Sequence, residues 1–477
     1  MRSDGRLLAG CPLSAESLQK GDRIFSMRPD RFFLVAGLAC GLAFVFGTPP
    51  FQAPDETIHF YRAYAVSEGN LSAQRGEDGF GAVLPASLEE IGTGLRGDLP
   101  FRPGLKMDPD KISAALRVPL EPERRKFTDY RTSALFKPVG YLPQAVGIAV
   151  ARLFGAPALV LLYAARLANL LAATVLITIA LRRLPAYPWL LTMLALTPMA
   201  LFLRSSGSAD GIGTAAAFLL AATVARLAWG EETRGGWANI GDIAIVTVCT
   251  AAVCLAKPVY LPLALVVLLI PRGSFPEGRR GVFLLFHGTV TAAAFALALT
   301  TAGAVDVSIR PDAPIDPDRQ IADALADPLR VAWILTDDYL RLGRRYVAQI
   351  VGQLGWLDVN LPKPLLWGYA LVLGVLTLLD TRPEVAVRPW QRVLLAGLAL
   401  ATMALISASQ YASWTPYGAS HVEGIQGRYF IPLVPAAVWI FHTRRSPAPF
   451  LNRVLPWISL VSVGVAFWTL LQRYYGS

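Results

Sequence analysis

Long apolar stretches alternate with short charged connectors along most of the chain. Because a helix needs about 20 mostly apolar residues to span a bilayer, this pattern predicts an all-α polytopic membrane protein with about eleven transmembrane helices. The weakest segment, 258–270, could instead be half of a broken helix with its predecessor. The predicted segments are 31–49, 157–181, 187–203, 210–228, 239–256, 258–270, 281–303, 365–380, 391–408, 429–442 and 454–471.

Arginine-rich connections, such as Arg182-Arg183 and Arg444-Arg445, recur at alternate positions between these segments. Positive residues favour the cytoplasmic side, so the pattern predicts a cytoplasmic N-terminus. The alternation holds only if residues 50–156 form one large outer loop, which we expect to contain short helices. Residues 304–364 are then a second outer segment. Residues 1–30 form a cytoplasmic tail, and 31–477 a single transmembrane domain.

The amino-acid composition supports a membrane protein and argues against a soluble one. The chain is 54% hydrophobic and 16% charged, with a mean hydropathy of +0.45, whereas soluble domains carry about 25% charged residues. The net charge of +10 does not indicate a nucleic-acid partner, because most arginines flank apolar runs and suit contacts with membrane lipids. No glycine-rich nucleotide-binding loop is visible, which disfavours a nucleotide-sugar substrate.

Eight ionisable side chains collect at the outer ends of the predicted helices and just after the first one. Ionisable groups at membrane depth are costly and usually face a cavity or the bundle interior. Any one of them could instead extend to the lipid headgroups. Together they predict a site for an anionic ligand on the outer face. They are Asp55, Glu56, His59, Arg62, Arg204, Asp210, Lys257 and Arg428.

The stretch from Pro54 to Ala63 is the most specific motif. We expect a short helix with Pro54 in its first turn, in which Asp55, His59 and Arg62 share one face. A carboxylate held beside a cation near the membrane suits a general base that deprotonates a hydroxyl. The alternative is an acidic first turn that only complements the helix dipole.

This stretch and further motifs in the same order resemble a family of bacterial membrane proteins known as domain of unknown function 2142. The resemblance extends over nearly the whole chain from about residue 32. Gly207 departs from it, since we expect a larger residue there. The further motifs are Tyr141-Leu142-Pro143, Arg166-Leu167-Ala168-Asn169-Leu170, Leu196-Thr197-Pro198-Met199, Ser205-Ser206-Gly207-Ser208-Ala209-Asp210-Gly211, Lys257-Pro258-Val259-Tyr260, Gly355-Trp356-Leu357-Asp358 and Gln426-Gly427-Arg428-Tyr429-Phe430-Ile431-Pro432.

That family resembles the GT-C superfamily of membrane glycosyltransferases, which implies a GT-C-like bundle in the bacterial inner (cytoplasmic) membrane with its active site facing the periplasm or exterior. Such enzymes carry an acidic catalytic residue in the first outer loop and use sugars linked to a polyprenyl phosphate or diphosphate. The resemblance implies Asp55 as general base with Glu56 beside it, and Asp210 as a second acidic motif. The implied reaction transfers a sugar, with inversion, to a cell-envelope glycan, glycolipid or other exported acceptor.

Basic residues have a task in such a reaction, because fixed cations stabilise a phosphate leaving group best where water is scarce. Arg428 and Lys257 are the first choices and Arg204 the third, while His59, Arg62, Asp210 and Tyr429 complete the predicted substrate site. Several outer aromatic residues, Trp356 among them, suit either sugar stacking or the interfacial belt. Trp414 and Tyr417 are the stacking candidates, because they lie in the outer loop directly before Arg428.

His421 and Glu423 could join His59 at a divalent metal, but these residues lack the spacing of metal ligands. We therefore predict no metal and no cofactor. Two other functions stay open. A transporter or flippase of lipid-linked sugars often shows repeats with paired broken helices, and we see no such halves. An oligosaccharide polymerase or ligase differs only in using diphosphate-linked donors.

Overall fold

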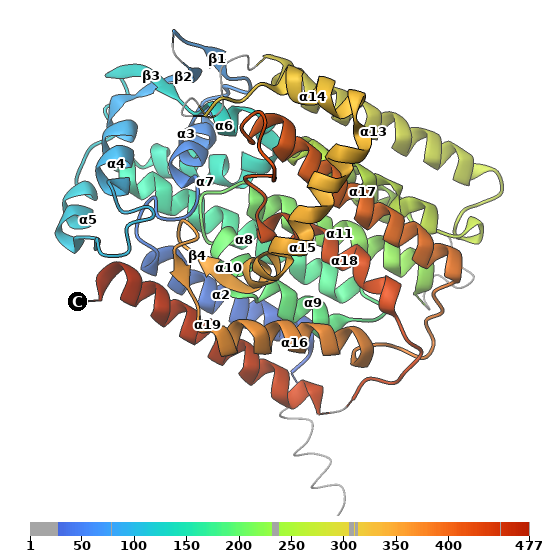
Figure 1. The fold of residues 1–477 in the computed structure, drawn as a ribbon. Helices are drawn as coiled ribbons and strands as arrows, with labels where there is room; N and C mark the ends of the chain where they lie inside the picture. The colour runs from blue at the N-terminus through green and yellow to red at the C-terminus, as the bar shows by residue number, and fades with distance from the viewer. Residues whose placement is uncertain are drawn as a thin grey trace, which may run out of the picture.

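A computed structural model describes residues 27–77, 79–230, 238–304, 310, 313–448 and 450–476. The predicted N-terminal tail lies outside the described residues apart from its last four, and so does part of the second outer segment. The described chain is a bundle of helices with two small sheets (Figure 1).

Among the described residues, six helices are long and apolar enough to cross a membrane. Each coincides with a segment predicted from the sequence, so the class of membrane protein is confirmed. The total of about eleven spans stays a prediction. The six helices are α2 (Pro29–Gly47), α8 (Ala158–Arg183), α11 (Asp210–Trp229), α13 (Arg279–Ala304), α17 (Pro389–Ser413) and α19 (Leu451–Tyr475).

The other predicted segments are helical but shorter or interrupted. Segment 187–203 divides because Pro198 cannot continue a helix, and the Thr197 side chain accepts a hydrogen bond from the Ala200 amide to begin a new one. Segment 258–270 is a 3-10 helix that contains Pro262. These elements are α9 (Pro188–Ala195), α10 (Pro198–Arg204), α12 (Ile240–Ala256), η3 (Pro258–Leu269), α16 (Lys363–Leu379), η5 (Gly427–Leu433), α18 (Val434–Ala437) and η6 (Val438–Phe441).

Residues 50–156, the predicted first outer loop, contain the short helices that we predicted, together with a sheet that the all-α prediction omitted. The antiparallel order is β1-β2-β3. Most residues of β2 are buried, so the strand lacks the alternation by which sequence reveals a strand. The elements are α3 (Glu56–Ser67), β1 (Gln74–Arg75), β2 (Phe80–Pro85), α4 (Ala86–Arg96), α5 (Pro109–Ala115), β3 (Arg125–Asp129), α6 (Arg131–Ala134), η1 (Pro138–Tyr141) and α7 (Leu142–Leu153).

The predicted second outer segment contains two amphipathic helices, and at the N-terminus of each an aspartate side chain accepts a hydrogen bond from a backbone N–H. A short hairpin follows and carries Trp356 in its turn. The elements are α14 (Pro317–Ala326), α15 (Pro328–Gly352), β4 (Gln353–Leu354) and β5 (Val359–Asn360), and a further turn, η4 (Arg272–Ser274), lies between η3 and α13.

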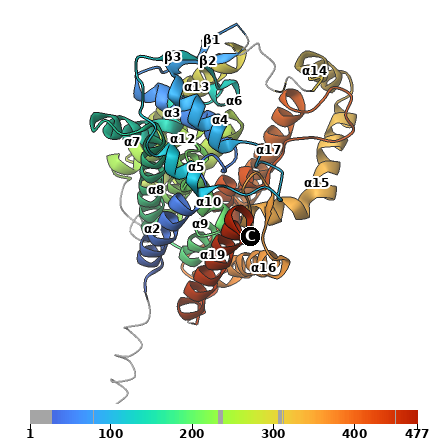
Figure 2. The same ribbon diagram turned by 90° about the vertical axis from the view of Figure 1, so that its left-hand side faces the viewer.

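Connections that we predicted to be cytoplasmic contact one another. Arg182 pairs with Asp30 at 2.9 Å, Arg183 pairs with Asp242 at 2.5 Å, and the Thr381 hydroxyl donates to a backbone carbonyl of the 444–445 connection. The sheet β1–β3 lies with α3 and α4 at the other end of α2 and α8 (Figure 2). This grouping agrees with the predicted alternation, while the topology and its orientation stay predictions.

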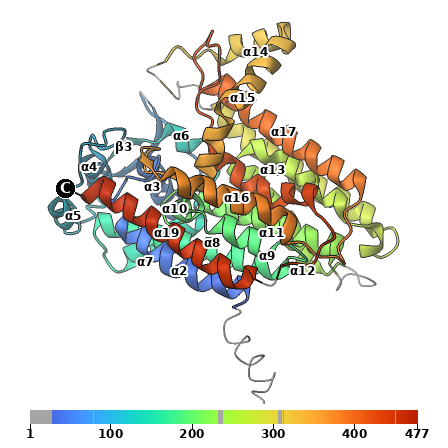
Figure 3. The same ribbon diagram turned by 60° about the horizontal axis from the view of Figure 1, so that its bottom comes forward.

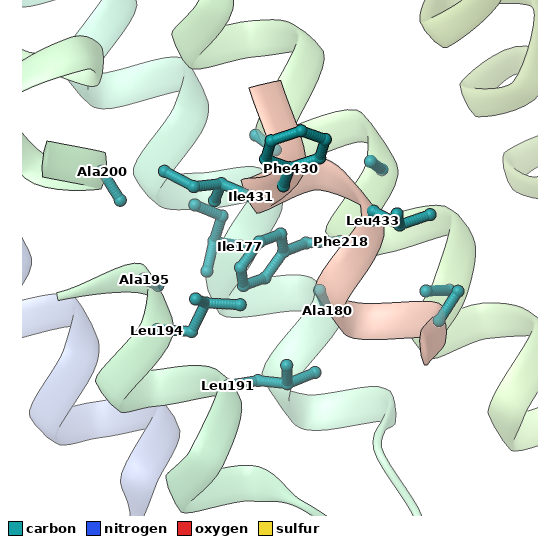
Figure 4. Packing of buried hydrophobic residues seen from close by; sticks show 14 of the residues in the cluster. Ile177, Ala180, Leu191, Leu194, Ala195, Ala200, Phe218, Phe430, Ile431 and Leu433 are labelled. Atoms are coloured by element: carbon teal, nitrogen blue, oxygen red, sulfur yellow. The ribbon is translucent and has the colours of Figure 1, made fainter. Parts of the chain in front are cut away.

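Apolar packing holds η5 inside the bundle although it is too short to span a membrane. Figure 4 shows Phe430, Ile431 and Leu433 of η5 beside Phe218 of α11 and Ile177 of α8. On another face, α16 and α19 lie side by side over α9 (Figure 3). This packing fixes the backbone of η5 and therefore the position of Arg428, the charged residue near its N-terminus.

Single cysteines should test the topology after the four native cysteines are replaced. Glu123→Cys and Ser420→Cys are expected to react with an impermeant maleimide added outside intact cells, because both side chains are exposed in predicted outer segments. Gly273→Cys and Ser446→Cys should react only after the membrane is permeabilised. Labelling of position 123 from the cytoplasm alone would overturn the topology and the location of the site.

Candidate active site

Asp55 lies directly before α3 with its backbone in the left-handed region, at φ +59°. The helix begins at Glu56, so Pro54 belongs to the preceding turn and not to the first helical turn that we expected. The Asp55 side chain makes no capping hydrogen bond to α3 and is 46% exposed. Its carboxylate therefore remains accessible instead of serving the helix end.

Both oxygens of the Glu56 carboxylate accept hydrogen bonds. Arg166 donates from Nε and Nη2 at 2.8 and 2.5 Å, and the backbone amides of Phe51 and Gly207 donate at 3.0 and 2.9 Å. Both charged side chains are 0% exposed. The other Arg166 N–H groups bind the Val45, Thr48 and Pro49 carbonyls. We predicted Glu56 in the catalytic set, but the structure makes it an anchor between α3 and α8, because no side of its carboxylate is open.

Replacing Glu56 with Gln should therefore reduce stability more than it alters chemistry. Breaking a buried ion pair leaves an unpaired charge and typically costs about 3–5 kcal/mol. We expect a clearly lower thermal unfolding temperature in detergent. Glu121→Gln is the matched control, because that side chain is 44% exposed and pairs with Arg124 on the same loop. Equal unfolding temperatures for Glu56→Gln and wild type would contradict the anchor role.

Four charged side chains from distant segments meet beside α3; we name Asp55, Asp210, Lys257 and Arg428 the charged cluster. Lys257 Nζ lies 2.6 Å from Asp210 Oδ1. Arg428 Nη2 lies 3.5 Å from Asp55 Oδ2, and its Nε lies 3.8 Å from Asp210 Oδ2. Lys257 stands where α12 ends and η3 begins, which confirms the helix break predicted before Pro258.

Arg428 carries the unusual feature of the cluster. Its side chain is only 4% exposed, and its Nε and Nη1 atoms are buried without a hydrogen-bond partner. Leaving buried donors unpaired costs free energy, and such donors are rare in proteins. Both nitrogens are therefore suited to an additional acceptor, such as a phosphate oxygen.

Aromatic rings and His59 form a wall beside the cluster. His59 Nδ1 lies 2.7 Å from the Tyr141 hydroxyl, and its ring stacks on Phe136 with centroids 6.0 Å apart. Lys257 Nζ lies 4.5 Å from the centre of the Tyr429 ring. Burial lowers the pKa of His59 from 6.5 to about 4, although the charges of Asp55 and Asp210 oppose this. The imidazole is therefore neutral at physiological pH.

The lowered pKa of His59 predicts a loss of stability in acid. The unfolded chain binds a proton as the pH falls through 6.5, whereas the folded protein binds it only near 4. Stability is complete above pH 6.5 and decreases between 6.5 and 4. We expect His59→Gln to lose less of its unfolding temperature over this interval than wild type. His421→Gln, at an exposed histidine, is the control, and identical profiles for all three proteins would contradict the prediction.

Asp55 also lines a pocket of about 880 Å³, which we name the outer pocket. Its volume falls within the range of small-molecule sites, about 300–1,000 Å³. Of the charged cluster, Asp55 is the member that also lines this pocket. The described lining residues are Asp55, Thr57, Ile58 and Tyr61 of the α3 segment, Gly76, Glu77 and Gly79 near β1, Glu89, Thr93 and Arg96 of α4, Phe127, Thr128 and Asp129 of β3, and Trp356.

A family model described as predicted membrane protein (DUF2142) matches residues 38–437, which includes the whole charged cluster and the outer pocket. The chain belongs to the DUF2142 family. No curated protein and no solved structure matches the chain significantly. The family resemblance seen in the sequence is confirmed, and the family's description states no activity.

The motifs that indicated the DUF2142 family contact one another in space. Besides the contacts of His59 with Tyr141, of Glu56 with Arg166 and of Lys257 with Asp210, the Asn169 amide donates to the Ser206 and Ser208 carbonyls at 2.7 and 3.1 Å. The Tyr260 hydroxyl donates to the Tyr429 carbonyl at 2.8 Å. Motifs scattered along the chain therefore build one site and its support.

The structure does not bring Arg62 or Arg204 into the charged cluster. Arg62 is fully buried, and it donates to the Asn70 and Leu71 carbonyls at 3.1 and 2.6 Å. The cation beside Asp55 is thus Arg428 and not Arg62, which we had expected on the same helix face. Arg204 donates to the Ala195 carbonyl and lies over the Phe33 ring. A buried guanidinium takes carbonyl partners where no carboxylate is within reach.

Trp414 and Tyr417, the predicted stacking residues, lie in a separate cluster near α14. Arg310 pairs with Glu423 at 2.5 Å and lies over the Trp414 ring. The Tyr417 hydroxyl donates to Asp323 at 3.2 Å. Within the described part of the chain, no three His, Cys, Asp or Glu side chains are grouped as a metal site requires, and metal independence stays a prediction.

Three residues of the site and its support, Arg166, Tyr141 and Trp356, belong to sequence motifs for which we predicted no specific site role. Arg166 did carry a usable signal, because an arginine in the middle of the apolar run 157–181 needs a buried partner. Tyr141 carried none, and Trp356 stayed open between sugar stacking and the interfacial belt, since aromatic residues near membrane interfaces are common.

Proposed function

We propose that this DUF2142 protein is a membrane glycosyltransferase of the bacterial inner membrane, with its site facing outward. It transfers a sugar from a polyprenyl-phosphate-linked donor to a hydroxyl of an envelope glycan, glycolipid or other exported acceptor. One observation carries the proposal: Asp55 belongs both to the charged cluster and to the outer pocket. An accessible carboxylate that contacts a buried cation and also lines a pocket suits a base between two substrates.

In the proposed reaction, an acceptor hydroxyl in the outer pocket gives its proton to Asp55. The hydroxyl oxygen forms a bond to the anomeric carbon of the donor sugar. The bond between that carbon and the phosphate oxygen breaks, and the lipid phosphate leaves with the bonding electrons. A single in-line displacement of this kind inverts the anomeric centre and forms no covalent enzyme intermediate.

Arg428 is the proposed ligand of the leaving phosphate. Its buried Nε and Nη1 make no hydrogen bond, so each can donate to a phosphate oxygen on its own side of the planar, permanently charged guanidinium. Lys257 is already paired with Asp210 at 2.6 Å, so we assign it to holding that carboxylate. When Asp55 takes up a proton, its attraction for Arg428 at 3.5 Å weakens, which leaves the cation to the phosphate as charge develops there.

The test is reconstitution of purified protein in liposomes that contain polyprenyl-phosphate-linked sugars. Release of free polyprenyl phosphate together with a glycosylated acceptor supports the proposal. Movement of the intact labelled lipid between leaflets without such release indicates a flippase. Turnover restricted to diphosphate-linked oligosaccharides indicates a polymerase or ligase. Either of the last two outcomes overturns the proposal in its present form.

A further inference from the structure

We infer that the outer pocket is the acceptor site and that it takes a hydroxyl-rich sugar without phosphate, sulfate or carboxylate groups. The acceptor role rests on the proposed function, whereas sugar binding is testable apart from it. The observation that carries the inference is a set of buried polar atoms without hydrogen-bond partners on side chains that line this pocket. They are Thr57 Oγ1, Tyr61 OH, Thr128 Oγ1 and Trp356 Nε1.

Such atoms are normally satisfied, because an unpaired buried donor or acceptor costs about 1–3 kcal/mol. Thr57, Tyr61 and Thr128 are each less than one-tenth exposed. Three hydroxyls and one indole N–H around a single pocket can both donate to and accept from ligand hydroxyls. A sugar ring presents hydroxyls in several directions, so it can satisfy donors that come from α3, β3 and the Trp356 turn together.

The charges of the lining side chains restrict the class of sugar that the outer pocket can bind. The side chains of Asp55, Glu77, Glu89 and Asp129 line the pocket, against one arginine, Arg96. Glu89 pairs with Lys126 at 3.0 Å and Asp129 with Arg131 at 2.7 Å; neither partner is among the lining residues. An anionic sugar would meet like charges in this pocket, which is costly.

Trp356 supplies the apolar wall that such sites need. Arg96 lies 4.9 Å from its ring centre, and the Phe101 ring meets it edge to face at 6.0 Å. These two contacts hold the indole in place. A fixed aromatic ring beside hydroxyl partners suits the apolar C–H face of a sugar and loses little conformational freedom on binding.

Gly92 of α4 provides a test of the pocket. A Cβ added there would overlap the Tyr61 hydroxyl and lie 3.0 Å from the Thr57 methyl carbon Cγ2, so Gly92→Ala must displace the Tyr61 hydroxyl and press on the Thr57 side chain. Gly94, two residues later in the same helix, has nothing within 4 Å of an added Cβ. Gly94→Ala is therefore the matched control, since both changes replace a helical glycine by alanine.

The experiment measures binding of neutral trisaccharides, and of a uronic-acid trisaccharide, to full-length protein in nanodiscs by saturation-transfer NMR. We expect the neutral sugars to bind, the acidic one not to bind, and Gly92→Ala and Thr128→Val to weaken binding about tenfold. Gly94→Ala should bind like wild type. If Gly92→Ala does not fold, the sugar affinity of Thr128→Val tests the inference.

Asp55→Asn separates this inference from the proposed function, because the amide keeps the shape of the pocket. Binding of neutral sugars to this variant and to wild type, in a protein that transfers no sugar, supports the pocket and rejects the transferase. Transfer without binding of any neutral sugar, preferential binding of the acidic sugar, or equal binding by Gly92→Ala, Thr128→Val and wild type would overturn the inference.

Discussion

Replacing Asp55 with Asn is expected to abolish sugar transfer while the protein stays folded. Asn has the same shape but cannot take up the acceptor's proton, and loss of a general base typically slows a reaction by about 10²- to 10⁴-fold. The left-handed backbone at φ +59° also suits Asn, which tolerates this region better than most residues. The measurement is release of polyprenyl phosphate in liposomes, together with the unfolding temperature.

Two further variants sharpen this test. Asp98→Asn removes a carboxylate that is 76% exposed on the same outer loop and should transfer sugar like wild type. Asp55→Ala should lose transfer and also some stability, because alanine in the left-handed region costs about 1–2 kcal/mol. Near-wild-type transfer by Asp55→Asn would remove Asp55 from the role of base.

Arg428→Ala should slow transfer by about 10²- to 10³-fold, the usual effect of removing one donor that stabilises transition-state charge. Donor binding should weaken at the same time, because the phosphate loses its buried partner. Arg428→Lys should recover only part of the activity, since it keeps the charge and loses the bidentate fork. Turnover measured against donor concentration separates the two effects.

The control for Arg428 is Arg330→Ala, which removes an arginine that is 53% exposed in the second outer segment. Removing Arg428 also leaves Asp55 and Asp210 without their shared cation, so the unfolding temperature must be measured beside activity. Equal turnover by wild type, Arg428→Lys and Arg428→Ala would show that Arg428 serves the structure and not the reaction.

Position along the chain predicts the four members of the charged cluster, together with residues that lie outside it. Asp55, Asp210, Lys257 and Arg428 stand at the ends of apolar runs, where charge is costly and needs a reason. Arg62 and Arg204 have the same signature, and the sequence predicts them as members too. The difference is one of direction: their guanidinium groups turn to the carbonyls of Asn70 and Ala195. Hydropathy indicates how deep a residue lies and not which neighbour its side chain faces.

The apolar runs also predicted the long helices, because bilayer thickness sets their length and composition. No such one-dimensional rule exists for β2, in which five of six residues are buried and a period of two is missing. The sequence pattern also does not predict that Glu56 pairs with Arg166 or Asp55 with Arg428, since these contacts depend on how helices distant in sequence pack. The positions of the long helices thus follow from local chemistry, whereas the anchor, the cation at Asp55 and the outer pocket arise from packing that brings separate segments together.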